Sequence, residues 1–274
     1  MPEKFQVVPL RAFKDNYVWT LRNGACAAVV DPGEAQPVLD YLAAEKLQLI
    51  AILATHHHQD HVGGIAELLQ THKVPVYGPR GEPIATLTQA VGGGDKVSLE
   101  QLGVSFEVLD IPGHTRAHVA YYGANMLFCG DTLFACGCGR AFEGTPQQLY
   151  ASLEKLMALP GRNARLLRAR VHAGEHRLRQ GGGAGQRGAA RARGERRAVC
   201  GATTDPTLPS TIGREKATNP FRARHAARGH RLGQQISRQA RVSDPAGGVR
   251  RAAAVEERYP ESPASSPSRC GLAR

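Results

Sequence analysis

The segment Thr55-His56-His57-His58-Gln59-Asp60-His61 lies between an apolar run at residues 49–54 and the pair Gly63-Gly64. Its imidazoles and carboxylate are the ligands that zinc and similar divalent ions prefer. The apolar run predicts a buried strand, whose end would aim several of these ligands at one point. A run of His can also be a non-specific metal-binding tract, but the His-x-His-x-Asp-His spacing before two small residues favours a true metal site.

The residue pattern on either side of this stretch predicts an α/β fold. Short β-favouring runs bounded by turn residues predict strands at 5–10, 17–21, 26–30, 49–54, 74–77, 96–99, 104–111, 117–122 and 126–129. Helical spacing of apolar residues predicts helices at 36–46, 65–69 and 147–159. Two β-rich halves with outer helices predict a four-layer αββα sandwich over residues 1–160, with ligands on loops at the sheet edges.

Two further polar sites stand where predicted strands end. Pro112-Gly113-His114-Thr115 follows one strand, and Cys129-Gly130-Asp131-Thr132 follows another. A single Asp or His at such a place is most often a turn or capping residue. Together with the His-rich stretch, however, they offer a third imidazole and a carboxylate able to bridge two ions.

The composition changes sharply after residue 160. Residues 1–160 hold 11 basic and 16 acidic residues, which leaves 24 basic and 8 acidic ones, a net charge of +16, for residues 161–274. Phe221 and Tyr259 are the only aromatics in that segment. So few large apolar groups bury too little surface to offset the entropy of the chain. We therefore expect most of 161–274 to be a disordered, Arg-rich tail.

Composition also bounds the partners and the compartment. The basic tail could contact nucleic acid or a membrane, but it lacks the interleaved aromatics that stack on bases, so we expect neither partner. The six cysteines include no CxxC pair, which suits a reducing cytosol. We see no leader pattern after Met1 and no apolar run long enough to span a bilayer. We expect a soluble, cytoplasmic monomer.

The metal-site motifs resemble those of the metallo-β-lactamase fold. More narrowly, Phe13-Lys14-Asp15-Asn16-Tyr17 and the Cys-Gly-Arg-Ala-Phe-Glu-Gly of residues 138–144 resemble glyoxalase II, the hydroxyacylglutathione hydrolases. The resemblance runs continuously over residues 5–160. It implies two divalent ions, expected to be zinc with iron or manganese as alternatives. The family's ligands fall on His56, His58 and His114 for one ion, on Asp60 and His61 for the other, and on Asp131 as the bridge.

The resemblance also implies a reaction. The enzyme would hydrolyse S-lactoylglutathione, an S-2-hydroxyacylglutathione thioester, to glutathione and D-lactate, the second step of methylglyoxal detoxification. Asp60 and Asp131 would act in catalysis through the hydroxide that the ions generate. Arg140 and Phe142 match substrate-binding positions. Arg140 could pair with a carboxylate of the tripeptide or be an ordinary solvated side chain, and Phe142 lacks the hydroxyl of the Tyr in some members.

The family pattern breaks after residue 160. The family has a further second-ion ligand, the His of a Tyr-Cys-Gly-His-Glu-Tyr-like motif, where residues 165–176 here read RLLRARVHAGEH. Codons allowed for residues 163–175, read one base later, encode Thr-Arg-Val-Tyr-Cys-Gly-His-Glu-Tyr-Thr-Leu-Ala-Asn. We infer a frameshift near Gly161-Arg162, in the gene or in its sequencing. Residues 206–221 resemble the family's glutathione-binding segment again, as an island within a remnant of its helical C-terminal domain.

These departures lead to an expectation about activity. The vacant ligand position predicts weak binding of the second ion and little thioesterase activity in this chain. His172 and His176 lie near that position, but their spacing does not support a role as ligands. The alternatives are a persulfide dioxygenase-like enzyme with one iron, and a frameshift product without activity.

Overall fold

The computed structural model describes residues 5–134, 137–160, 165–167 and 210–219, all within one compact unit of the chain. Most of the predicted tail, including His172, His176 and the position of the vacant ligand, lies outside these residues. Within them, no helix has the length and apolar character needed to cross a membrane.

The first sheet has six strands in chain order. They are β1 Gln6–Ala12, β2 Asn16–Asn23, β3 Cys26–Val30, β4 Gln48–Leu53, β5 Val76–Pro79 and β6 Gln89–Val91. The first three pair antiparallel, and β3 to β6 pair parallel. Parallel neighbours need a crossover connection, which α1 (Gln36–Glu45) provides between β3 and β4. The short α2 (Gln59–Val62) and α3 (Ile65–Thr71) provide it between β4 and β5.

The second sheet takes strands from a wider span of sequence. Its order is β14 Ser210–Thr211, β13 Arg165–Leu167, β10 Met126–Phe128, β9 Val119–Gly123, β8 Val104–Asp110 and β7 Lys96–Leu99. The strands β7 to β10 form an antiparallel meander, and β13 pairs parallel with β10. A small hairpin, β11 Leu133–Phe134 with β12 Gly137–Cys138, stands apart from both sheets. The sheet therefore extends past residue 160.

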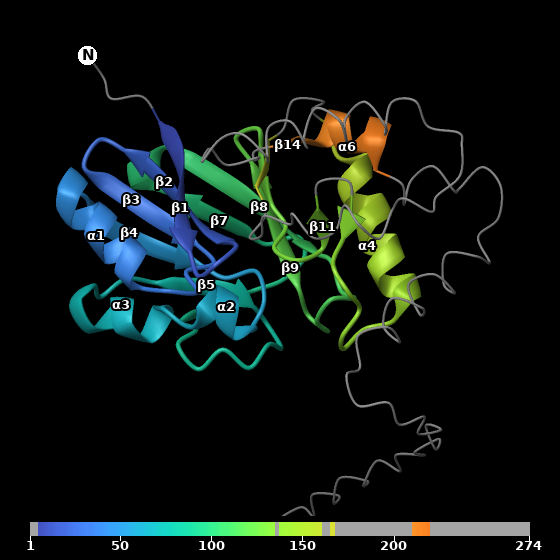
Figure 1. The fold of residues 1–274 in the computed structure, drawn as a ribbon, viewed down its shortest axis with the longest axis horizontal. Helices are drawn as coiled ribbons and strands as arrows, with labels where there is room; N and C mark the ends of the chain where they lie inside the picture. Colours follow the sequence, from blue (N-terminus) through green and yellow to red (C-terminus); the bar gives the residue numbers. More distant parts are fainter. Residues whose placement is uncertain (1–4, 135–136, 161–164, 168–209, 220–274) are drawn as a thin grey trace, which may run out of the picture. The chain divides into compact units, whose positions relative to one another are not determined.

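Three apolar cores hold four layers together. Alternation along β2 sends Trp19 into the core between the two sheets and Val18 into the core under α1 and α3. The third core joins the second sheet to α4 (Pro146–Ala158) and α6 (Ile212–Thr218) through residues such as Leu127, Leu153 and Ile212. Figure 1 shows α1 and α3 beside the first sheet and α4 beside the second. The predicted αββα sandwich is confirmed.

The predicted elements agree with the observed ones to within a few residues. Sequence patterns missed β6, the hairpin β11–β12, the helix α2 and a 3-10 helix at Glu100–Leu102, each of four residues or fewer per element. Periodicity cannot distinguish such short elements from turns. Sequence patterns also missed β13, β14 and the seven-residue helix α6, because the composition after residue 160 predicts disorder. The helix α4 begins at a capping box, in which Thr145 accepts from the Gln148 amide while the Gln148 side chain accepts from the Thr145 amide.

Candidate metal centre

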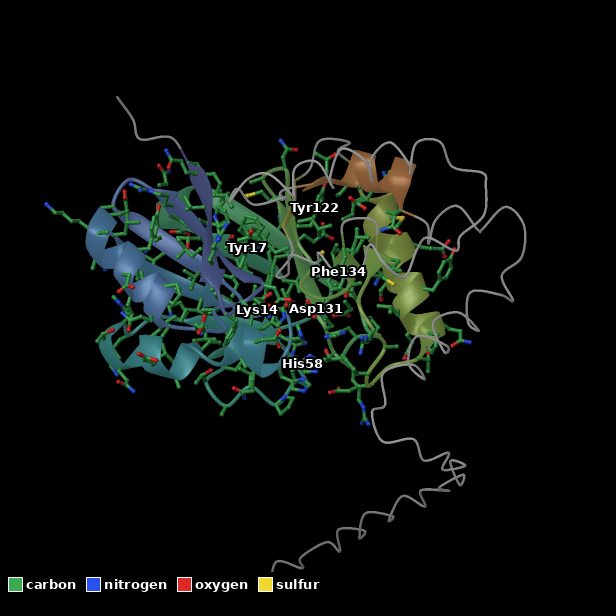
Figure 2. The ribbon with its side chains drawn as sticks, viewed as in Figure 1. Lys14, Tyr17, His58, Tyr122, Asp131 and Phe134 are labelled. Carbon is green, nitrogen blue, oxygen red and sulfur yellow. The ribbon has the colours of Figure 1, made fainter. Side chains whose placement is uncertain are left out.

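The three sequence motifs meet at one edge of the described unit. The His-rich stretch follows β4, His114 follows β8, and Asp131 follows β10. Figure 2 shows His58 and Asp131 near one another, where loops from both sheets come together. Gly113 allows the loop that carries His114 to lie close against α4, because a Cβ at this position would be 2.5 Å from Leu149 Cα. Its φ of +138° also favours glycine.

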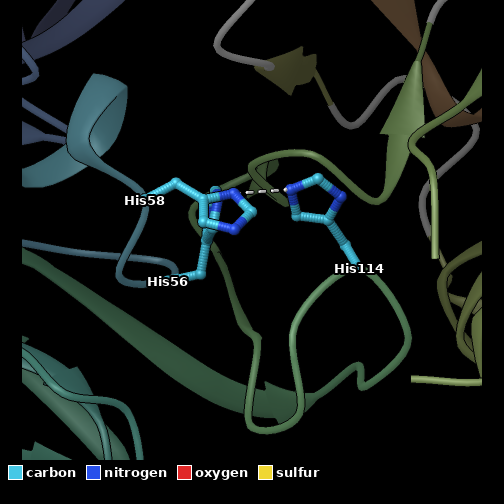
Figure 3. A group of neighbouring side chains, drawn as sticks. All are labelled: His56, His58 and His114. Carbon is cyan, nitrogen blue, oxygen red and sulfur yellow. Dashed lines mark hydrogen bonds between the residues drawn. The ribbon is translucent and has the colours of Figure 1, made fainter. Parts of the chain in front are cut away.

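Three imidazoles form the first donor group, His56, His58 and His114 (Figure 3). The Nδ1 atom of His58 lies 3.2 Å from Nε2 of His56 and 3.0 Å from Nε2 of His114. Tetrahedral ligands with metal–nitrogen bonds of about 2.0–2.1 Å are separated by roughly 3.3 Å. The donor chemistry and spacing of this group therefore fit one divalent ion.

The second donor group consists of His56, His61 and Asp131, so it shares His56 with the first. The Nε2 atom of buried His61 lies 3.5 Å from Oδ1 of Asp131 and 3.6 Å from Oδ2 of Asp60. The other oxygen of Asp131, Oδ2, lies 3.6 Å from Nε2 of His114. One carboxylate thus faces both groups, and the mixed imidazole and carboxylate donors of the second group fit a divalent ion as well.

The first group is electrically neutral before any cation binds. Burial, followed by the neighbouring imidazoles, holds the pKa of His56 well below its ordinary value. Burial likewise lowers the pKa of His58 and of His114. Neutral imidazole is the form that binds metal, so this group needs to release no proton.

The second group behaves differently because of its carboxylates. Burial lowers the pKa of His61, but Asp31 and Asp131 outweigh it and raise that pKa to about 10. Asp31 lies with Oδ2 3.1 Å from Nδ1 of His61, which directs Nε2 towards Asp60 and Asp131. A carboxylate behind a ligating His is the usual way to fix its tautomer and orientation.

Further hydrogen bonds hold Asp31, Asp60 and His114 in place. The amide and hydroxyl of Thr55 donate to the two oxygens of Asp31, at 2.7 and 2.8 Å. The side-chain amide of Asn16 donates to Oδ2 of Asp60 at 3.0 Å and to its carbonyl at 3.2 Å. The Nδ1 atom of His114 donates to the Arg140 carbonyl at 2.8 Å, which leaves Nε2 to face His58.

His118 is a supporting residue that sequence reasoning missed. It is fully buried, and its ring stacks on that of His56 with centroids 4.5 Å apart. Its Nδ1 donates to the Val119 carbonyl, and its Nε2 accepts from the Asp131 amide at 3.3 Å. Both ring nitrogens are thus directed to backbone groups, and the role of His118 is to hold Asp131 and His56. His118 falls inside the strand predicted at 117–122, whereas β9 begins at Val119, so nothing in the sequence pattern signalled this role.

Glu82 is a second supporting residue that was not predicted from the sequence. Its buried carboxylate accepts from the His57 amide at 3.1 Å and from the Ala117 amide at 2.9 Å, and it contacts the His57 ring. The Nε2 atom of His57 lies 3.2 Å from Glu143. His57 therefore points towards two carboxylates, as expected for a residue that alternates with the ligands, and Glu82 joins the loop before α2 to the loop before β9.

The two candidate substrate-binding residues lie at this centre in different ways. The ring of Phe142 is 61% exposed, yet its centroid lies 5.3 Å from that of His114 and 5.9 Å from that of His58. Arg140 is exposed, and its carbonyl is the group that contacts His114. The structure thus brings all six sequence-predicted ligands together, with Phe142 beside them.

Comparisons with known proteins assign the chain to a family. Residues 13–171 match the model of the metallo-β-lactamase superfamily. The chain is 46% identical to a hydroxyacylglutathione hydrolase of Nitrosomonas eutropha, over 87% of this chain and 93% of that protein. It is 48% identical to one of Cupriavidus taiwanensis, over 79% of this chain and 85% of that protein.

A solved structure supports the fold. The crystal structure of ETHE1 from Myxococcus xanthus is similar with a TM-score of 0.65 and 24% identity, over 89% of this chain and 92% of that one. From its sequence, its sandwich of two sheets and its relatives, the chain belongs to the metallo-β-lactamase superfamily and, within it, to the hydroxyacylglutathione hydrolases.

Proposed function

We propose that this metal-dependent hydrolase cleaves S-2-hydroxyacylglutathione thioesters, with S-lactoylglutathione giving glutathione and D-lactate. The observation that carries the proposal is Asp131, whose two oxygens face two adjacent donor groups. A shared carboxylate between two divalent ions is the arrangement that a two-metal hydrolase needs. The names of the relatives supply the substrate class.

The proposed ligand sets follow the two groups. His56, His58 and His114 hold the first ion, Asp60 and His61 hold the second, and Asp131 bridges them. The prevalence of imidazole favours zinc, with iron or manganese as alternatives. The proposed setting is a cytoplasmic monomer that acts on a small molecule and binds neither nucleic acid nor membrane.

The chain's own residues position the reactants. Divalent ions in such a centre lower the pKa of coordinated water and polarise a carbonyl oxygen. Asp60, held at its carbonyl and its carboxylate by Asn16, is placed to orient the attacking water at one face of the centre. Asp131 faces both donor groups from a fixed position, because the His118 ring and the loop of Gly139 hold its backbone. The leaving group is a thiolate, which departs readily. The reaction therefore needs no side-chain nucleophile.

The substrate would approach on the exposed side of the first group. Phe142 stands edge-on to His58 and His114 and provides an apolar wall for the hydroxyacyl and thioester atoms. Arg140 is exposed and stands two positions before Phe142 in the sequence. Its guanidinium can pair with a carboxylate of glutathione.

The test measures free thiol released from S-lactoylglutathione by the purified chain with and without added zinc. The proposal predicts slow turnover that a chelator abolishes. A matched variant, in which the frame-restored sequence replaces residues 163–175, should turn over faster and bind the second ion more tightly. Oxygen uptake with glutathione persulfide and one bound iron would favour the dioxygenase instead, and loss of all turnover in both chains would contradict the proposal.

A further inference from the structure

The segment at 210–219 is folded onto the catalytic unit although it lies far along the sequence. The strand β14 pairs with β13, and α6 follows it immediately. Ile212 is fully buried in the core that contains Leu153 and Leu156 of α4. Lys216 donates from Nζ to the Leu159 carbonyl at 3.1 Å. Two kinds of contact, apolar and polar, therefore fix the position of α6.

Asn219, just after α6, reaches from this segment to the hairpin β11–β12. The residue is 2% exposed, and its amide N–H continues the helix by donating to the Glu215 carbonyl at 2.8 Å. Its side-chain nitrogen donates to the carbonyls of Phe134 at 3.3 Å and Gly137 at 3.0 Å. These two residues are opposite one another in the hairpin. An Asn amide carries two N–H donors, so one side chain can hold both strands together.

The hairpin connects two parts of the metal centre. It begins two residues after Asp131 and ends two residues before Arg140, whose carbonyl accepts from His114. At its base the Gly139 amide donates to the Thr132 carbonyl at 3.1 Å. The packing there is so close that a Cβ on Gly139 would lie 1.7 Å from the Asp131 carbonyl. A shift of the hairpin would therefore move the bridging carboxylate and the partner of His114 together.

We propose that Asn219 is a positioning residue for the metal centre, which acts through the β11–β12 hairpin on Asp131 and His114. The assignment of a metal to these residues rests on the proposed function, whereas the clamp on the hairpin rests on the hydrogen bonds alone. Outer partners of metal ligands typically change metal affinity about 10–100-fold when they are removed. The proposal gives residues 210–219 a part in positioning the metal centre, which is separate from the contact with glutathione that the family resemblance implies.

The experiment compares N219A, N219D and N219Q with the control K216A. Lys216 anchors the same segment but contacts α4 rather than the hairpin. We expect N219A and N219D to weaken binding of added zinc at least about tenfold and to change the visible spectrum of the cobalt-loaded protein. K216A should leave both near wild type, and N219Q, which keeps the amide, should recover part of the affinity. Equal zinc affinities of N219A and K216A at matched thermal stability would overturn the proposal.

A second measurement works without any metal. Hydrogen exchange of the Gly139 amide in the metal-free protein should be faster in N219A than in K216A, because the hairpin is no longer held. Unchanged exchange would refute the clamp even if the chain proves to be a thioesterase. Faster exchange in a chain that binds no zinc would instead support the clamp and refute the proposed metal function, so the two failures are distinguishable.

Discussion

The first and second donor groups differ in charge although they share His56 and both face the carboxylate of Asp131. The first consists of three imidazoles whose pKa values burial lowers. In the second, Asp31 and Asp131 overcome the effect of burial and raise the pKa of His61 to about 10. In the metal-free chain the lowered pKa values therefore favour neutral imidazoles in the first group, whereas the raised pKa favours a protonated His61 in the second.

The difference follows the places of the donors in the sequence. All donors of the first group lie within residues 56–114, on loops that both sheets fix. The second group, among the described residues, has one imidazole apart from the shared His56. The resemblance implies a further His for it, and residues 165–176 do not match the motif that would supply it. The proposed centre should therefore bind two ions with unequal affinity.

Changing the shared carboxylate should have the largest effect. D131A removes the oxygen that faces His61 and the one that faces His114, so we expect both ions to be lost. H58A should remove only a donor of the first group. Metal content after dialysis distinguishes these outcomes. Two ions retained by D131A would contradict the role of Asp131 as a bridging ligand. The loss of affinity should exceed the roughly 10–100-fold that changes behind a ligand cause.

A change behind His61 should separate the two groups. D31N removes the negative charge beside Nδ1 of His61 but leaves the first three imidazoles in place. We expect about 10–100-fold weaker binding of the second ion and an unchanged affinity for the first. Zinc titration by calorimetry checks this result, and N16A, which acts on Asp60 instead, serves as a second probe of the same group. Equal weakening of both ions by D31N would show that the groups are not independent.

The charge difference also predicts a pH effect on the metal-free protein. Because the pKa of His61 is raised from 6.5 to about 10 on folding, its charged form stabilises the fold. That contribution is fully present below pH 6.5 and is lost as the pH rises through about 10. Urea unfolding of the metal-free chain at several pH values should show this loss in wild type and in H72A, but not in H61A. A pH-independent difference between H61A and wild type would contradict the assignment.

The smallest expected effect concerns Glu82, which joins two ligand loops. Burial raises its pKa, but hydrogen bonds that include those from His57 and the Ala117 amide outweigh burial and lower it. Its stabilising effect is therefore present above its unfolded pKa and is lost as the pH falls through its folded one. E82A leaves buried N–H donors unpaired and should cost about 1–3 kcal/mol in the free energy of unfolding at pH 7. E82Q, which keeps an acceptor, should cost less, and its difference from wild type should shrink in acid, whereas part of the cost of E82A should remain because its N–H donors stay unpaired.

The proposed ligands could be predicted from the sequence to lie together because each belongs to a local motif at the end of a strand. Their supporting residues could not, because they come from elsewhere: Asp31 lies 24 residues before Thr55, and Glu82 lies 25 residues after His57. Asp31 follows β3 as Asp131 follows β10, so its place at a strand end was a usable signal. Asn219 lies 82 residues from Gly137, and only the folded chain brings them together.

The fold shows the same contrast. Long periodic segments such as α1 and α4 were predicted well, and the two-residue strands β11 and β12 were not. The tail was expected to be disordered on its composition, and the part of it that the structure describes at 210–219 coincides with the island that resembles the family. The helix α6 is held there by the burial of Ile212 rather than by its own length.

The most direct test of the central claim is a calorimetric titration of the metal-free chain with zinc. We expect two binding steps whose affinities differ by about 100-fold or more, with the weaker step strengthened when the frame-restored sequence replaces residues 163–175. Two equally tight steps in the chain as it stands, with full turnover of S-lactoylglutathione, would contradict that claim.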